Sequence, residues 1–171
     1  MFLGVGSNVD PVRHIEEALL LLKKSVKVLA SSTFYWTTAL HRPEQRPFLN
    51  GCWLIQTDCP PLSLKEGVLK RIEARMGRLR TKDKWADRSI DLDVLLWADR
   101  VEGGDICTLP HPDIRDRPFV AIPLLELEPD LKMPDTGERL DGLDVVLRRD
   151  GLTAAEAVTT RLKKIIAEGA G

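Results

Sequence analysis

The spacing of hydrophobic and polar residues changes several times along the chain, and each change predicts an element. Apolar runs rich in β-branched and aromatic residues are typical of strands. They predict strands at the start of MFLGVGSN, over residues 26–37 and 48–57, and in RSIDLDVLL at residues 88–96. Turn residues at 99–104 predict a short return strand after the last of these.

Helical spacing of apolar residues predicts the other elements. Asp10 followed by Pro11 is typical of a helix start, and helical spacing continues over residues 14–24. The same spacing predicts helices over residues 62–76, 119–127 and the segment after residue 150. Gly77 is the expected C-cap of the first of these three.

The order of the elements favours an α+β fold. The strands at 26–37 and 48–57 follow each other without a helix between them, which favours a largely antiparallel sheet with helices on its faces. A Rossmann fold is disfavoured because the early GxG lacks its third glycine and a well-placed acidic residue. No linker or repeat interrupts the chain, so we expect residues 1–171 to form a single domain with residues 150–171 as a C-terminal helical extension.

Two carboxylates occupy alternate positions in the apolar segment RSIDLDVLL. Because strand side chains alternate between faces, Asp91 and Asp93 should project together, away from their apolar neighbours. Two adjacent carboxylates repel each other and need compensation. One interpretation is a Mg²⁺ site, since Mg²⁺ takes one or two carboxylates and completes its shell with water and phosphate oxygens. The alternative is a solvent-exposed strand face with a nearby arginine or lysine as counter-ion.

Basic residues are concentrated in the helix and loop immediately before this pair. The guanidinium fork suits phosphate oxygens, so Arg78, Arg80 and Arg88 are candidates for binding a polyphosphate. The alternative is a solvated helix face and loop, which describes Lys70, Arg71, Lys82 and Lys84.

Residues in polar loops leave two interpretations open. Trp85, in the charged loop, is either part of a lid or a simple anchor of the loop. His111, in the proline-bounded stretch LPHPDIRDRP, is either a donor to phosphate or a loop histidine without a partner. The polar segment TALHRPEQRP is too long for a hairpin turn and is a candidate binding loop.

Composition narrows the class of protein. With 171 residues, 43% hydrophobic and 30% charged, the chain is typical of one globular domain. A net charge of −1 gives no overall attraction to nucleic acid or to an anionic membrane. Three cysteines without a CxxC pair favour a reducing compartment, and the start of the chain does not match a signal peptide, so we expect a cytoplasmic protein.

Six segments, in this order, resemble 6-hydroxymethyl-7,8-dihydropterin pyrophosphokinases, a family of the folate pathway. They are GVGSN, FYWTTAL, FLNGCWLIQT, RIEARMGRLR, KWADRSIDLDVLLW and LPHPDIRDRPFVAIPLLELEPDL, and they span roughly residues 2–133. The resemblance implies a ferredoxin-like three-layer α-β-α sandwich around a mostly antiparallel sheet. It also implies transfer of diphosphate from ATP to the hydroxymethyl group of the reduced pterin, with release of AMP, in tetrahydrofolate biosynthesis.

The resemblance further implies site residues. Asp91 and Asp93 match the aspartates that hold two Mg²⁺ ions, and with Arg78 and Arg88 they form the expected catalytic set. The expected pterin-binding residues are Thr37, Leu40, Phe48, Asn50, Trp85 and Phe119, with the two phenylalanines stacking on the ring and Asn50 hydrogen-bonding its edge. The expected ATP-binding residues are Lys70, Glu73, Arg80, Arg88, Val94, His111 and Arg117. ATP and the pterin are the expected partners of a monomer.

Some positions depart from the family pattern. Lys70 stands where a glutamine is familiar, and Pro112 stands where some members have an aromatic residue. Residues 38–41, Thr-Ala-Leu-His, replace a loop that usually contains proline and glycine. The tail beyond about Leu140 matches nothing in the family, and we expect its helix to pack against the fold rather than take part in catalysis.

Two other functions compete with this interpretation. Nucleotidyltransferases also combine a GS turn with a DxD strand, but in that class the two usually lie close in sequence, whereas Ser7 and Asp91 are far apart. A ferredoxin-like RNA-binding module could use the basic 70–88 segment, but it needs exposed aromatic residues and an overall basic charge. Four Phe, four Trp, one Tyr and a net charge of −1 do not fit that class.

Overall fold

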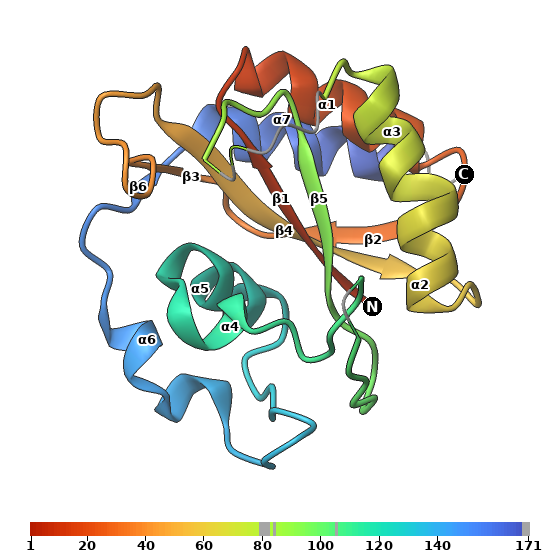
Figure 1. Ribbon diagram of the computed structural model, residues 1–171, viewed down its shortest axis with the longest axis vertical. Coiled ribbons are helices and arrows are strands. Elements are labelled where there is room, and N and C mark those ends of the chain that lie inside the picture. The colour runs from red at the N-terminus through yellow and green to blue at the C-terminus, as the bar shows by residue number, and fades with distance from the viewer. Residues whose placement is uncertain (79–82, 84, 105, 169–171) are drawn as a thin grey trace.

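The computed structural model describes residues 1–78, 83, 85–104 and 106–168, and its central sheet has helices on both faces (Figure 1). The strands are β1 (Phe2–Ser7), β2 (Lys27–Ser31), β3 (Tyr35–Thr37), β4 (Phe48–Gln56), β5 (Asp91–Leu96) and β6 (Thr153–Ala154). Their order is β5-β1-β4-β3-β6, and β2 pairs with the second half of β4. These pairings are antiparallel, as the sequence predicts.

The helices and the sheet form three layers. One face carries α1 (Pro11–Leu22), α7 (Glu156–Ala167) and a long helix composed of α2 (Pro61–Leu64), η1 (Lys65–Leu69) and α3 (Lys70–Arg75). The other face carries α4 (Asp113–Asp116) and α5 (Pro118–Leu127), which are followed by η2 (Leu140–Gly142) and α6 (Asp144–Leu147). The expected three-layer α+β sandwich is therefore confirmed, and the antiparallel pairing excludes a Rossmann fold.

The alternation of side chains in β1 separates two hydrophobic cores. Leu3 and Val5 are buried in the core shared with α1, α3 and α7. Gly4 and Gly6 face the opposite side, where a β-carbon at Gly4 would lie 3.2 Å from the Leu95 side chain of the second core. Glycine at these two positions keeps the backbone of β1 accessible from the α5 side of the sheet.

The strand predicted over residues 26–37 is wrong in one respect, because the structure has two strands there, β2 and β3. They pair with different halves of β4. Between them the Cys52 N–H donates to Ser32 Oγ (2.9 Å), and the Phe34 ring is fully buried against Gly51. A β-carbon at Gly51 would lie 2.6 Å from that ring. Strand propensity is uniform along the segment, so only this packing reveals the break.

The helix predicted over residues 62–76 is present, but its middle turn is a π-helix. The Lys70 N–H donates to the Lys65 carbonyl, five residues earlier, where an α-helix would use the residue four earlier. This wider turn shifts the register of the side chains that follow it. Gly77, with a φ of +74°, ends the helix as predicted, but it lies one position beyond the C-cap residue, which is Met76.

Two local predictions are confirmed only in part. Asp10 occupies the N-cap position before α1, but its side chain makes no capping hydrogen bond. The return strand predicted after residues 99–104 is reduced to an isolated bridge between Glu102 and Leu109.

The C-terminal residues extend both the sheet and a core. β6 pairs with the outer edge of β3, the Phe34 N–H donates to Thr159 Oγ1 (2.9 Å), and Leu162 on α7 is fully buried. The extension predicted at 150–171 thus contains a strand as well as a helix, and its residues 169–171 lie outside the described ranges. We propose that residues 1–171 form one domain. Within the described ranges, none of the helices has the length and apolar character needed to cross a membrane.

Leu162→Ala is expected to lower the free energy of unfolding of the whole domain by about 2–5 kcal/mol, because it opens a cavity beneath the sheet. Leu147→Ala is the matched control: Leu147 is 78% exposed, and its truncation should change stability by less than about 0.5 kcal/mol. Urea unfolding followed by circular dichroism measures both. Equal effects of the two substitutions would contradict the proposal that the tail folds with the sheet.

Candidate active site

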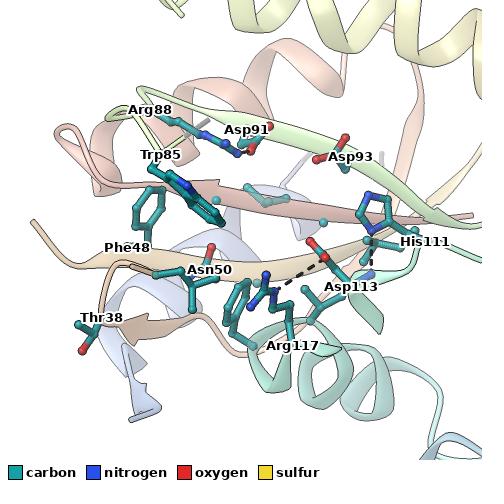
Figure 2. A pocket seen from close by; sticks show the side chains of 18 of the residues that line it. Thr38, Phe48, Asn50, Trp85, Arg88, Asp91, Asp93, His111, Asp113 and Arg117 are labelled. Atoms are coloured by element: carbon teal, nitrogen blue, oxygen red, sulfur yellow. Dashed lines mark hydrogen bonds and ion pairs between the residues drawn. The ribbon is translucent and has the colours of Figure 1, made fainter. Parts of the chain in front are cut away.

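A cavity of about 430 Å³ opens on the α5 side of the sheet and is lined by β1, β4 and β5. Figure 2 shows Asp91 and Asp93 along one wall, His111 toward one end, and Phe48 and Trp85 toward the other. The cavity therefore joins a charged end to an aromatic end.

The side-chain alternation predicted for β5 is present. Asp91 and Asp93 both line the cavity, while Leu92 between them is buried in the core on the other face. Val94 continues that apolar face and is 1% exposed. The two carboxylates therefore project together, as the pattern predicts.

Cationic side chains neutralise both carboxylates. Arg78 and Arg88 form ion pairs with the two oxygens of Asp91, and Lys65 Nζ lies 2.9 Å from Asp93 Oδ1. Burial alone would raise the pKa of Asp93, but Lys65, together with His111 and Arg78, more than offsets this and lowers the pKa below its usual value. Asp93 is therefore ionised at neutral pH.

Arg78 connects the end of α3 to β5. Its guanidinium contacts Glu73 as well as Asp91, and Glu73 Oε1 also accepts the Leu92 N–H (3.0 Å). Burial raises the pKa of Glu73, while the Leu92 N–H and Arg78 oppose that shift. Burial would lower the pKa of Arg78, but Asp91 and Glu73 raise it overall. These contacts lie behind the cavity wall and hold the Asp91 carboxylate in place.

The turn after β1 acts as a clamp on the chain that enters β5. Ser7 Oγ donates to the Ser89 carbonyl (2.6 Å), and the Asn8 amide both donates to Asp87 Oδ1 (2.6 Å) and accepts the Arg88 N–H (2.7 Å). The Asn8 N–H also donates to the Arg88 carbonyl (3.0 Å). The polar groups of this GSN turn thus bind backbone and side chain of residues 87–89, and this positions Arg88 beside Asp91.

Asn50 is oriented by its neighbours in the sheet. It is 8% exposed, lines the cavity, and donates from Nδ2 to Thr37 Oγ1 (2.8 Å). A β-carbon at Gly6 would lie 2.7 Å from Asn50 Oδ1, so glycine leaves the amide its space. In the segment 37–40, Leu40 lines the cavity as predicted, and Thr38 also lines it. Thr37 is not among the lining residues and instead accepts the hydrogen bond from Asn50.

Trp85 lines the cavity and is also anchored to the neighbouring loop. Its ring centroid lies 4.4 Å from that of His41, and its carbonyl accepts Gln45 Nε2 (3.0 Å). Arg42 forms an ion pair with Asp83 at 2.8 Å, which joins the same two segments. This placement agrees with both interpretations of Trp85, as part of a lid and as an anchor of the loop.

The backbone orients His111. Its N–H donates to the Leu95 carbonyl (2.9 Å), and the Asp113 N–H donates to its Nδ1 (3.3 Å). Because Nδ1 is an acceptor, the neutral ring carries its proton on Nε2, which can donate to a ligand. Arg117 Nε lies 3.8 Å from Asp113 Oδ1, so His111 and Arg117 share one support (Figure 2). The alternative of a histidine without a partner is therefore wrong.

Several predicted ATP-binding side chains lie away from the cavity wall. Lys70 forms an ion pair with Glu66 on its own helix, Glu73 belongs to the network behind β5, and Val94 faces the core. Val94 is 1% exposed and does not line the cavity. Arg80 lies outside the described residues. Arg78 and Thr37 do not line the cavity either, and the other predicted site residues do: Leu40, Phe48, Asn50, Trp85, Arg88, Asp91, Asp93, His111, Arg117 and Phe119.

The sequence interpretation missed some residues of the site. Lys65 pairs with Asp93, but this contact between the long helix and β5 has no signature in the hydrophobic spacing. Gln45 and Asp113 also line the cavity: Gln45 lies in the predicted binding loop TALHRPEQRP, and Asp113 begins α4 within the proline-bounded stretch LPHPDIRDRP. The amide of Gln45 and the carboxylate of Asp113, in polar segments, could have identified both residues as candidates from the sequence.

The donor set at Asp91 and Asp93 suits Mg²⁺. Carboxylate oxygens are ligands that this hard cation prefers, and it completes its shell with water and phosphate oxygens. Within the described part of the chain, no three or more His, Cys, Asp or Glu side chains converge as a metal-binding group. One or two carboxylates are the protein ligands that Mg²⁺ usually takes.

A family model described as 7,8-dihydro-6-hydroxymethylpterin-pyrophosphokinase (HPPK) matches residues 2–129. The chain belongs to the HPPK family. The match ends just after α5, so η2, α6, β6 and α7 lie beyond it.

Curated relatives are similar over the same region. The 2-amino-4-hydroxy-6-hydroxymethyldihydropteridine pyrophosphokinase of Haemophilus influenzae is 33% identical over 138 residues, which cover 79% of this chain and 85% of that protein. The protein of the same name from Aquifex aeolicus is 35% identical over 135 residues, 78% of this chain and 83% of that protein. The folic acid synthesis protein fol1 of Schizosaccharomyces pombe is 39% identical over 142 residues, 81% of this chain and 19% of that much longer protein.

Membership of the HPPK family decides between the competing functions. The nucleotidyltransferase and the RNA-binding module each rested on one local feature, the GS turn with DxD or the basic 70–88 segment. The HPPK match extends from β1 to α5 and includes both features.

Asn8→Ala is expected to loosen the segment that carries Arg88, because it removes the donor to Asp87 and the acceptor of the Arg88 N–H. Hydrogen exchange followed by NMR should find the Arg88 amide exchanging at least about tenfold faster. Arg13→Ala, an exposed substitution on α1, should leave that amide unchanged. Equal protection of Arg88 in the Asn8 variant would rule out the clamp.

Proposed function

We propose that this HPPK-family chain transfers the diphosphate of ATP to the hydroxymethyl group of 6-hydroxymethyl-7,8-dihydropterin and releases AMP, a step of folate biosynthesis. The observation that carries the proposal is the family match over residues 2–129, which includes the cavity with its carboxylate pair and aromatic rings. Relatives that share this region are named pyrophosphokinases. ATP is the co-substrate of this transferase.

We propose that Asp91 and Asp93 hold two Mg²⁺ ions. A carboxylate offers about four lone-pair sites, so Asp91 retains acceptor positions for an ion beside Arg78 and Arg88. When bound, the ions would neutralise charge on the polyphosphate and on the group in transfer. Arg78 and Glu73 keep the Asp91 carboxylate fixed, so we assign Arg78 a positioning role within the predicted catalytic set.

We propose that Arg88, His111 and Arg117 bind the phosphate chain. All three line the cavity close to the carboxylate pair, and they come from two separate segments. Arginine can form two parallel hydrogen bonds to phosphate oxygens, and His111 Nε2 offers a single directed donor. The ATP roles predicted for Lys70, Glu73, Arg80 and Val94 remain predictions that need separate tests.

We propose that the aromatic end of the cavity binds the pterin. Phe48 and Phe119 provide flat apolar surface for stacking, with Leu40 and Trp85 beside them. Asn50, held by Thr37, offers a donor and an acceptor toward a heterocycle edge. Stacking supplies contact area, and the amide supplies direction.

The reaction requires positioning and charge neutralisation more than a strong base. The cavity supports this requirement, because its charged and aromatic ends would bring the phosphate chain and the hydroxymethyl group together. We assign no side chain as a general base. We further propose a cytoplasmic monomer, and the free thiols Cys52, Cys59 and Cys107 fit a reducing compartment.

Asp93→Ala is expected to abolish AMP formation from ATP and pterin while the fold remains intact, because it removes one of the two carboxylates proposed to hold the metal. A coupled AMP-release assay measures activity, and circular dichroism checks the fold. Asp99→Ala, an exposed carboxylate just beyond β5, should retain wild-type activity. Substantial activity in Asp93→Ala would remove this carboxylate from the metal role.

Asn50→Ala is expected to weaken pterin binding by about 10- to 100-fold, because it leaves polar groups of the ligand unpaired. ATP binding should change by less than about threefold, since Asn50 lies among the residues assigned to the pterin. Calorimetric titration with each ligand measures both. Thr37→Val, which removes only the partner of Asn50, should give a smaller loss of pterin affinity. Equal losses for the two ligands would refute this division of the cavity.

A further inference from the structure

Lys65 is a cation of the site that neither the family pattern nor helical periodicity singled out. Its Nζ lies 2.9 Å from Asp93 Oδ1, and its side chain is 17% exposed, against 33% for Asp93. Lys70, one turn further along the helix, is bound to Glu66 and lies away from the cavity. The ammonium of Lys65 is thus in direct contact with one of the two carboxylates proposed to bind metal.

Lys65 is the first residue of the π-turn, which packs against the sheet. η1 begins at Lys65, and the Lys70 N–H returns to the Lys65 carbonyl, so this turn contains one residue more than an α-helical turn. Leu64 and Leu69 on either side are fully buried in the core. They anchor the turn against the sheet and hold the Lys65 side chain at the level of Asp93.

We propose that Lys65 is a built-in counter-ion that competes with the divalent cation for Asp93. It neutralises the carboxylate until metal and nucleotide bind, and it must give up its contact with Oδ1 when the metal takes that oxygen. This inference rests on the proposed metal role of Asp93.

A competing cation has a defined effect on affinity. In the protein without nucleotide, the ammonium at Asp93 Oδ1 repels a divalent ion and competes with it for that oxygen, so Lys65 lowers the intrinsic affinity of the site for metal. Asp91 differs, because its two arginine partners occupy both of its oxygens from opposite ends of the preceding loop. Lys65 therefore affects the metal affinity of Asp93 and not that of Asp91. Because it acts through the Asp93 carboxylate, it is a positioning residue.

The test is a titration of the full-length protein with Mn²⁺ alone, followed by the loss of the free-ion signal in electron paramagnetic resonance. Lys65→Met should bind Mn²⁺ about tenfold more tightly than wild type, because removal of one nearby positive charge favours the ion. Lys65→Arg keeps the charge and should bind no more tightly than wild type. Lys164→Met, on the exposed surface of α7, makes the same charge change far from the cavity and should leave the affinity unchanged.

A second measurement keeps the proposal testable if Lys65→Met is too unstable for the titration. The melting temperature of Lys65→Gln should rise more on addition of Mn²⁺ than that of wild type, because the ion restores the missing positive charge at Asp93. Unchanged or weaker Mn²⁺ binding in Lys65→Met, or equal thermal shifts in Lys65→Gln and wild type, would overturn the proposal.

Asp93→Asn separates this proposal from the proposed function. If Asp93→Asn loses Mn²⁺ binding while Lys65→Met binds like wild type, only the role of Lys65 fails. If Asp93→Asn binds Mn²⁺ as wild type does, the metal assignment of Asp93 fails, and the role of Lys65 fails with it.

Discussion

Two carboxylates on one face of β5 impose the constraint on which the site depends. Asp91 and Asp93 repel each other, and in a partly buried cavity each needs a nearby cation. The fold brings these cations from three places: Lys65 from the long helix, Arg78 from its end, and Arg88 from the chain entering β5. The packing of that helix against β5 is therefore an electrostatic requirement as well as a hydrophobic one.

The strand β1, which lies between β5 and β4, connects the parts of this arrangement. Its glycines leave room for Asn50 and Leu95 on the cavity side, and its leucine and valine fill the core on the other. The turn that follows binds residues 87–89 through Ser7 and Asn8. One short segment thus shapes the cavity floor and fixes the approach to the acidic strand, which gives a physical reason for the GVGSN sequence in this HPPK chain.

The parts that depart from the family pattern have structural explanations of their own. His41, in the altered loop at 38–41, contacts the Trp85 ring, and Gln45 holds the Trp85 backbone. Beyond the HPPK match, β6 covers the edge of β3, and α7 packs on the helical side of the sheet. The tail therefore adds to the sheet and the core, while His41 and Gln45 hold Trp85 at the aromatic end of the cavity.

The sequence by itself determined the features that follow from local backbone geometry. Period-two alternation put Asp91 and Asp93 on one face, Gly77 marked a helix end, and consecutive strands without a helix indicated an antiparallel sheet. The residue pattern also pointed to Arg88, Trp85 and His111, and the family resemblance added five more residues that line the same cavity: Leu40, Phe48, Asn50, Arg117 and Phe119.

Only the tertiary structure decided which partners these residues have. The break between β2 and β3 depends on where Phe34 packs against Gly51, and the choice of Lys65 over Lys70 depends on how the long helix lies against β5. The clamp from Asn8 to Arg88 joins positions 80 residues apart. Periodicity records which face a side chain takes within its own element, whereas ion pairs and packing depend on distances between elements, and those exist only after the chain has folded.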